Sequence, residues 1–287
     1  MRSLRRLRFL AVGAAIVGVA VACAVIAPVL APSDPYAQAV GDRLIPPVWE
    51  RGGSWTHPLG TDPLGRDLLS RIIYGARVSI SAGALAVAFS MVLGVIMGLL
   101  AGYFRGKVDG AISNLVDVML AFPFLLLALA AVAALGPGFG NMIVVLGLTG
   151  WPIYTRVVRA ETLKYREREF IQAARALGLG SFRILRAHVL PNLVNTIIVM
   201  ASLEVARMII LESFLSFLGL GIQPPTPSWG AMLGEGRVYM LSHWWLATFP
   251  GAAIFVTTLG INLFGDGLRD LLDPHRVLSG TAAARTE

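Results

Sequence analysis

The stretch VSISAGALAVAFSMVLGVIMGLLAGYF, residues 78–104, contains no charged side chain. A bilayer core about 30 Å thick is crossed by roughly 20 residues of α-helix. A second uncharged run, residues 9–31, is also long enough. Of the 287 residues, 56% are hydrophobic and 14% are charged, whereas an ordinary soluble domain carries roughly 25% charged residues. The sequence therefore predicts a polytopic membrane protein.

The apolar runs predict an all-α fold with six transmembrane helices. Their expected ranges are 9–31, 78–104, 111–135, 141–160, 193–215 and 244–268. Pro152 is expected to kink the fourth helix. The chain is accordingly divided into an N-terminal tail with the first helix (1–31), an extracytoplasmic segment (32–77), a five-helix core (78–268) with a cytoplasmic loop (161–192), and a C-terminal tail (269–287).

The N-terminus has an alternative interpretation. Four arginines precede the first apolar run, as in a signal peptide, and Ala20-Val21-Ala22-Cys23 faintly resembles a lipoprotein cleavage site. The run continues well past Cys23, which is too long for a typical signal peptide and favours a retained transmembrane helix.

Basic residues predict the orientation of the chain. Seventeen of the 24 lysines and arginines fall in the two termini, around residue 105 and in the loop between the fourth and fifth helices. Cytoplasmic loops are enriched in Lys and Arg, so we expect both termini to be cytoplasmic in a multi-pass protein of the bacterial inner membrane. The net charge of +7 then belongs to loops and does not indicate nucleic acid.

Within the extracytoplasmic segment, Thr61-Asp62-Pro63 predicts the start of a helix. Asp62 is a preferred capping residue, and Pro63 suits the first helical position. We expect this helix to continue through Arg71.

The motifs of common active sites are missing from the sequence. It has no phosphate-binding loop, no H-E-x-x-H zinc motif and no G-x-S-x-G nucleophile motif. The four histidines are scattered, and Cys23 is the single cysteine. We therefore predict no catalytic residue, no metal site and no cofactor in this chain, which favours a transport or scaffolding role over an enzyme.

Glycines and charges inside the apolar runs are candidates for helix packing or for a transport pathway. Gly94, Gly98 and Gly102 recur every four residues, which either allows close approach of another helix or reflects the general abundance of glycine in membrane helices. Glu204 and Arg207 are three residues apart, so they either pair along one helix face or line an aqueous path, as intramembrane charges often do. Glu212 is a further pathway candidate.

The loop 161–192 contains a short amphipathic helix. Phe170, Ala173, Ala174 and Leu177 follow helical spacing and form one apolar stripe, and Gly178 ends the helix. Such a helix either lies on the lipid surface or docks into a groove of a soluble partner.

At this loop the sequence resembles the permeases of ATP-binding-cassette importers. Their hallmark pattern, EAA, three residues, Gly, nine residues and I-x-L-P, is matched by Gln172-Ala173-Ala174, Gly178 and Leu190-Pro191, although Gln172 replaces the acidic residue and His188 the isoleucine. Three further stretches resemble the C-type subunits of the dipeptide, oligopeptide and nickel permease family. They are residues 57–67, residues 216–225 and residues 265–274.

This resemblance implies a type I importer fold and a set of partners. A second, paralogous permease would complete the pathway, two cytoplasmic ATPases would bind ATP and Mg, and an extracytoplasmic binding protein would deliver a peptide or similar solute. Phe170, Gln172, Ala173, Ala174, Leu177 and Gly178 would form the coupling helix that contacts the ATPases, and transport would proceed by alternating access.

Two other functions remain open at the level of sequence. An ion-coupled secondary transporter would use Asp117 or Glu204 as a relay, but it is expected to show internal repeats, and none is evident in the sequence. A non-transporting scaffold would leave the pattern in the loop 161–192 unexplained. The identity of the transported solute does not follow from the sequence.

Overall fold

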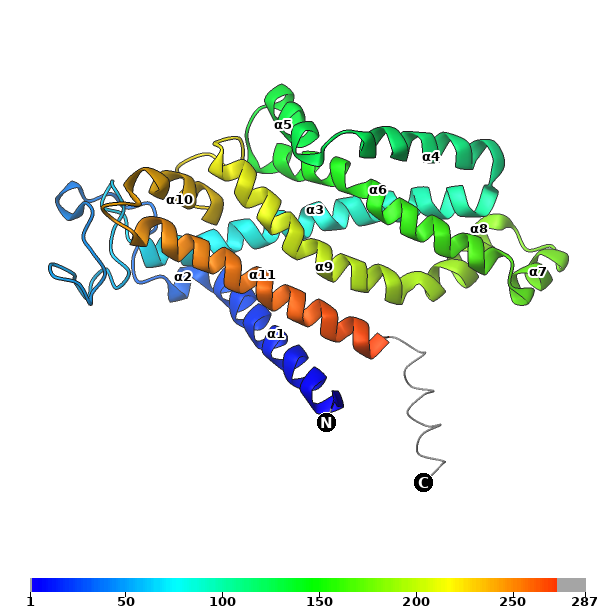
Figure 1. Ribbon diagram of the computed structural model, residues 1–287, viewed down its shortest axis with the longest axis horizontal. Coiled ribbons are helices and arrows are strands. Elements are labelled where there is room, and N and C mark those ends of the chain that lie inside the picture. Colours follow the sequence, from blue (N-terminus) through cyan, green and yellow to red (C-terminus); the bar gives the residue numbers. More distant parts are fainter. Residues whose placement is uncertain (1, 273–287) are drawn as a thin grey trace.

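The computed structural model describes residues 2–272, which form an elongated bundle of helices joined by loops (Figure 1). Five helices run for 24 to 37 residues and make up most of the bundle: α1 (Arg2–Val25), α3 (Leu68–Phe104), α6 (Phe139–Arg166), α9 (Leu190–Phe217) and α11 (Trp245–Leu272). The shorter helices are α2 (Ala27–Leu30), α4 (Gly106–Ala121), α5 (Phe124–Leu135), α7 (Glu169–Ala176), α8 (Ser181–Ile184) and α10 (Trp229–Gly236).

The predicted helical membrane fold is confirmed, and most residues of each of the six predicted spans are helical. By length and hydropathy, α1, α3, α11 and the continuous helical stretch Ser181–Phe217, which includes α8 and α9, are able to cross a bilayer. The pair α4 and α5 makes a fifth span if the two are taken together. Helix α6 has 28 residues but carries polar side chains along its length, so the count of six is not reached on these two criteria alone.

The third predicted span is broken, which corrects the expectation of one continuous helix over residues 111–135. Helices α4 and α5 meet at an angle of 91° at the Phe122-Pro123 step. Proline disfavours helical conformation in the residue before it, and Phe122 is accordingly extended. Pro152, where a kink was expected, lies within the unbroken helix α6.

The start of α3 also differs from the sequence prediction. We expected a helix capped by Asp62, but residues 61–67 form a loop, and Asp67 caps α3 by accepting a hydrogen bond of 2.8 Å from the backbone N–H of Ser70. Asp62 instead closes a turn by accepting from the N–H groups of Leu64 and Arg66. The helix therefore begins at Leu68, ten residues before the predicted span.

The bundle is held together by the close packing of α3 against α6. A Cβ atom added at Gly94 would lie 2.6 Å from the carbonyl oxygen of Trp151, and one added at Gly98 would lie 2.9 Å from that of Thr155. A Cβ atom added at Gly102 would likewise lie within 3 Å of Arg159 and Thr162. The hydroxyl of Thr155 donates a hydrogen bond of 3.2 Å to the carbonyl oxygen of Gly94. The two backbones approach at the positions where α3 has no side chain.

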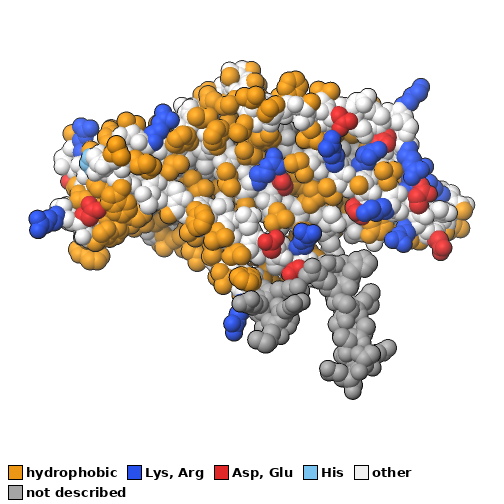
Figure 2. Space-filling view, viewed as in Figure 1, with side chains coloured by type: hydrophobic (Ala, Val, Ile, Leu, Met, Phe, Trp, Pro, Cys, Tyr) orange, Lys and Arg blue, Asp and Glu red, His pale blue; other side chains and the backbone are white. Residues whose placement is uncertain are grey.

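Polar and apolar side chains are separated along the long axis of the molecule. Figure 2 shows hydrophobic side chains over the middle of the bundle and many lysines, arginines and acids at the end that carries α7 and α8. The opposite end carries the loop 31–67 and α10 (Figure 1). This distribution is typical of a protein whose middle faces lipid and whose charged end, with α7 and α8, faces water.

Candidate functional site

Helix α7 has a buried face and an exposed face. The four residues predicted to form one apolar stripe are divided between these two faces. Ile171 is fully buried and Ala174 is 7% exposed, and both pack into a core cluster with Tyr103 and Val158. Phe170 is 46% exposed and Leu177 is 80% exposed. Ala174 therefore belongs to the chain's own core and is withdrawn from the predicted contact surface.

The outer face of α7 is apolar and available for contact. Phe170, Ala173 and Leu177, at helical spacing, are exposed, and Gln172 lies beside them. Gly178 follows the helix with a φ of +80° and no neighbour around its missing Cβ. It supplies the left-handed backbone that commonly ends a helix. We refer below to Phe170, Gln172, Ala173, Leu177 and Gly178 as the outer face of α7.

Tyr103 joins α7 to the end of α3, a contact that the sequence analysis missed. The Nε of Arg175 donates a hydrogen bond of 3.2 Å to the Tyr103 hydroxyl, and the guanidinium carbon lies 4.6 Å from the ring centroid. Arg166 donates a hydrogen bond of 2.7 Å to the Tyr103 carbonyl oxygen. Burial and the nearby charge of Arg175 lower the pKa of the Arg166 guanidinium, which lies past the predicted end of its span. No local sequence signal connects Tyr103 with Arg175, which lies 72 residues further along the chain.

Glu204 and Arg207 form an ion pair on α9, as one of the two sequence interpretations proposed. The Nη1 of Arg207 donates hydrogen bonds of 2.9 and 3.2 Å to the two carboxylate oxygens of Glu204. The side chains are 35% exposed for Arg207 and 15% for Glu204.

Glu212 is separated from that pair. It is fully buried and accepts hydrogen bonds from the hydroxyls of Ser216 (2.8 Å) and Ser213 (3.3 Å). The backbone of Trp229, at the start of α10, donates to Ser79 on α3 in the same region. Glu212 therefore lies within the core that joins α9 to α10, and we no longer count it among the pathway candidates.

A polar cavity of about 620 Å³ lies between α6, α9 and α11. Amide, hydroxyl and charged groups contribute to its lining, including Asn192, Asn195, Thr196, Glu161, Lys164 and Arg269. Lys164 and Glu161 form an ion pair of 2.6 Å at its rim. The cavity is large enough for a small solute.

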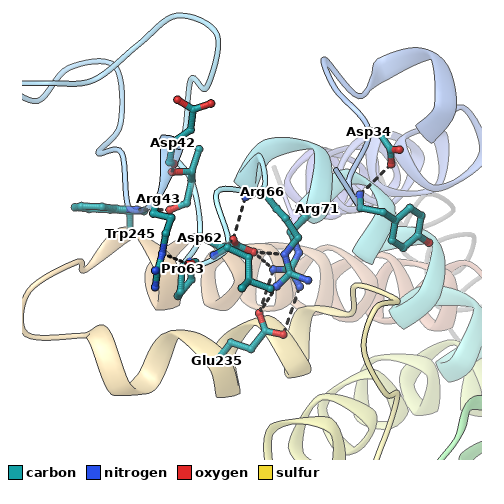
Figure 3. Close-up of polar contacts among 12 residues, drawn as sticks. Asp34, Asp42, Arg43, Asp62, Pro63, Arg66, Arg71, Glu235 and Trp245 are labelled. Atoms are coloured by element: carbon teal, nitrogen blue, oxygen red, sulfur yellow. Dashed lines mark hydrogen bonds and ion pairs between the residues drawn. The ribbon is translucent and has the colours of Figure 1, made fainter. Parts of the chain in front are cut away.

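At the other end of the bundle, a cluster of buried charges ties the loop 61–67 to α10 (Figure 3). Asp62 bonds to the guanidinium groups of both Arg66 and Arg71, and Glu235 of α10 lies 3.2 Å from Arg66 and 3.0 Å from Arg71. Both arginine side chains are at most 5% exposed. Glu235 is 33% exposed, and the two positive and two negative groups balance, so that neither buried arginine is left without a carboxylate.

Two family models match this sequence. One, described as "Binding-protein-dependent transport system inner membrane component", matches residues 90–277. The other, described as "N-terminal TM domain of oligopeptide transport permease C", matches residues 1–47.

Several characterised relatives cover most of the chain. The dipeptide transport system permease protein DppC of Escherichia coli (strain K12) is 46% identical over 92% of this chain and 88% of that protein. The di/tripeptide transport system permease protein DppC of Pseudomonas aeruginosa (strain UCBPP-PA14) is 45% identical over 88% of this chain and 83% of that protein. The glutathione transport system permease protein GsiD of Escherichia coli O6:K15:H31 is 47% identical over 78% of this chain and 74% of that protein.

Among solved structures, an inward-facing conformation of the MetNI methionine ABC transporter matches with a TM-score of 0.58. The match covers 71% of this chain and 96% of that chain at 18% identity. At this identity the likeness concerns the fold, and it agrees with the predicted importer permease fold.

Proposed function

The chain belongs to the family of binding-protein-dependent transport system inner membrane components, and from this premise we propose that it carries dipeptides or similarly short peptides. It is a permease subunit of an ATP-binding-cassette importer. The observation that carries the peptide assignment is that relatives at 45–47% identity are named for di- and tripeptides, dipeptides and glutathione. All of these solutes are short and peptidic.

In this proposal the chain pairs with a second, related permease, and solute passes along an accessible face of α9. Asn192, Thr196, Leu203 and Arg207 are spaced by four, seven and four residues, which places them on one face of the helix. Each of them is at least partly exposed. Asn192 and Thr196 line the polar cavity, so this face is polar at its beginning and charged at its middle.

The outer face of α7 is the proposed contact with one of two cytoplasmic ATPases, which would bind ATP and Mg, and the second permease would contact the other. Leu177 is 80% exposed although it is apolar. On the opposite face of the helix, Ile171 and Ala174 pack into the core of the chain. A helix with one anchored face and one exposed apolar face suits docking into a groove. Through Tyr103, a displacement of α7 reaches α3 and, by the close α3–α6 packing, the rest of the bundle. ATP-driven closure of the two ATPases would in this way switch the opening of the pathway from one side of the membrane to the other.

The extracytoplasmic face of the proposed complex is the end that carries the loop 31–67 and α10. A soluble binding protein would deliver peptide there. The buried cluster of Asp62, Arg66, Arg71 and Glu235 holds this end in one arrangement, which supports a role as a fixed docking platform.

The test is reconstitution of the chain in proteoliposomes with its permease partner, ATPases and binding protein. We expect ATP-dependent uptake of a radiolabelled dipeptide and stimulation of ATP hydrolysis by the peptide-loaded binding protein. A control complex with a catalytically inactive ATPase should take up none. ATP-dependent uptake of an unrelated solute, with no uptake of any di- or tripeptide, would contradict the peptide assignment.

A further inference from the structure

The ion pair of Glu204 and Arg207 has unused binding capacity. Only the Nη1 of Arg207 donates to Glu204, and among the described residues no hydrogen bond from its Nε or Nη2 is formed. The side chain is 35% exposed, so these N–H groups are within reach of a solute. A guanidinium presents its donors in a planar fork that matches a carboxylate.

The surroundings of the pair restrict what can approach it. The guanidinium carbon of Arg207 lies 5.0 Å from the ring centroid of Phe124, the first residue of α5 after the bend. One face of the cation is therefore covered by an aromatic ring, which favours a positive charge there. A solute can reach the edge of the guanidinium, where its donors point, and not this face.

Tyr154 adds a second, independent observation at the same place. Its hydroxyl is buried and has no hydrogen-bond partner, and its ring belongs to a core cluster that includes Phe124, Val205 and Met208, which flank the pair. A buried polar group without a partner is costly and is uncommon away from functional positions. The region therefore holds an ion pair with spare donors beside a hydroxyl that lacks a partner.

The lining of the polar cavity ends on α9 at Leu203, the residue before Glu204. Asn192 lines the cavity, and Arg207 lies 15 residues further along the same face, which corresponds to about 22 Å of helix. The lining residues Thr196 and Leu203 continue the face between them. Within the described residues, Glu204 and Arg207 are the charges of α9 on this accessible side, since Glu212 is buried.

We propose that Arg207 binds the terminal carboxylate, and Glu204 the terminal ammonium group, of a short zwitterionic peptide as it crosses the membrane. A zwitterionic peptide carries one positive and one negative terminal group, and the ion pair consists of one negative and one positive side chain. When the two side chains pair with the two peptide termini instead of with each other, every charge keeps a partner of opposite sign. No charge is then isolated at membrane depth. Glu204 and Arg207 are thereby specificity-determining residues, an inference that rests on the proposed function.

The test compares two forms of one dipeptide in the reconstituted complex, the free form and a form with an amidated C-terminus. The same wild-type binding protein, saturated with the peptide under study, is used throughout, so any change in the uptake ratio arises in the permease. We expect Arg207→Met to lower uptake of the free dipeptide about tenfold relative to the amidated form. Arg207→Lys, which keeps the charge but loses the fork, should give an intermediate ratio.

A double variant, Glu204→Arg with Arg207→Glu, serves as the control for folding. It keeps an ion pair on the same helix face and exchanges the positions of the two charges. Uptake of the amidated peptide by this variant shows that the exchanged pair still folds. If Arg207→Met lowers the uptake of both peptides equally, the pair only stabilises the fold and the inference is overturned. Failure of the proposed function is a different result, in which the wild-type complex takes up neither peptide with ATP.

Discussion

At the scale of single residues, Gly98 decides how close α3 lies to α6. Its added Cβ would be 2.7 Å from the Cβ of Val158 and 2.9 Å from a backbone oxygen, so the helices must separate to admit even a methyl group. We expect Gly98→Ala to destabilise the protein by about 1–3 kcal/mol, the usual range for overpacking. Gly110→Ala in α4, where no atom lies within 4 Å, is the matched control and should raise stability by up to about 1 kcal/mol, because alanine is the better helix former. Thermal unfolding in detergent measures both, and equal transitions would contradict the packing role.

Arg71 supports the opposite end of the molecule. Replacing it by alanine leaves Asp62 and Glu235 to share Arg66, and breaking a buried charge network in this way typically costs about 3–5 kcal/mol. We expect Arg71→Ala to lower the unfolding temperature and to expose the loop 61–67 to proteolysis. Arg51→Ala is a control, because Arg51 is exposed and such surface changes usually stay within about 0.5 kcal/mol. Similar protease resistance in the two variants would show that the cluster does not hold the loop.

At the scale of elements, the two faces of α7 can be tested separately. Leu177→Glu places a charge on the outer face without touching the core, so we expect normal folding but loss of ATPase co-purification and of uptake. Ala174→Glu places a charge in the chain's own core, so it should lower stability before any effect on partners appears. Gln172→Glu restores the acid that the family pattern has there and should retain uptake. Normal ATPase co-purification and normal uptake in Leu177→Glu would show that the outer face of α7 does not contact the ATPase.

The elements themselves follow from the sequence to different degrees. Long uncharged runs predicted the helices, because length and composition alone decide whether a helix suits a bilayer. The bend at Phe122-Pro123 did not stand out, since both flanking segments are apolar and the same composition suits one straight helix. On α7 the helical spacing was right, but Ile171 as well as Phe170 is apolar, so the sequence offered two faces and only packing against Tyr103 decides between them.

In the candidate site, too, some features follow from local sequence and others depend on residues far apart in the chain. The ion pair of Glu204 and Arg207 was among the sequence interpretations because three-residue spacing on a helix is local information. The cluster around Asp62 was missed, and Asp62 was wrongly expected to cap a helix. Its partner Glu235 is 164 residues from Arg71, and no local rule connects residues so distant in the chain.

At the scale of the whole molecule, orientation in the membrane remains a prediction from the distribution of basic residues. Figure 2 shows many of these charges at the end with α7 and α8. We expect a reporter fused after Arg175 to be cytoplasmic and one inserted between Gly52 and Gly53 to be extracytoplasmic. Alkaline phosphatase and green fluorescent protein fusions report the two compartments. The same compartment for both positions would contradict the arrangement of the two ends.

The buried charge cluster also sets an order of events during synthesis. Glu235 is made 164 residues after Arg71, and at about 5–20 residues per second roughly ten to thirty seconds separate them. During that interval Arg66 and Arg71 have one carboxylate of the cluster, Asp62, between two cations. The loop 61–67 can therefore reach its final arrangement only after α10 has left the ribosome. A nascent chain that ends before residue 235 therefore keeps two buried cations of this cluster with one carboxylate between them.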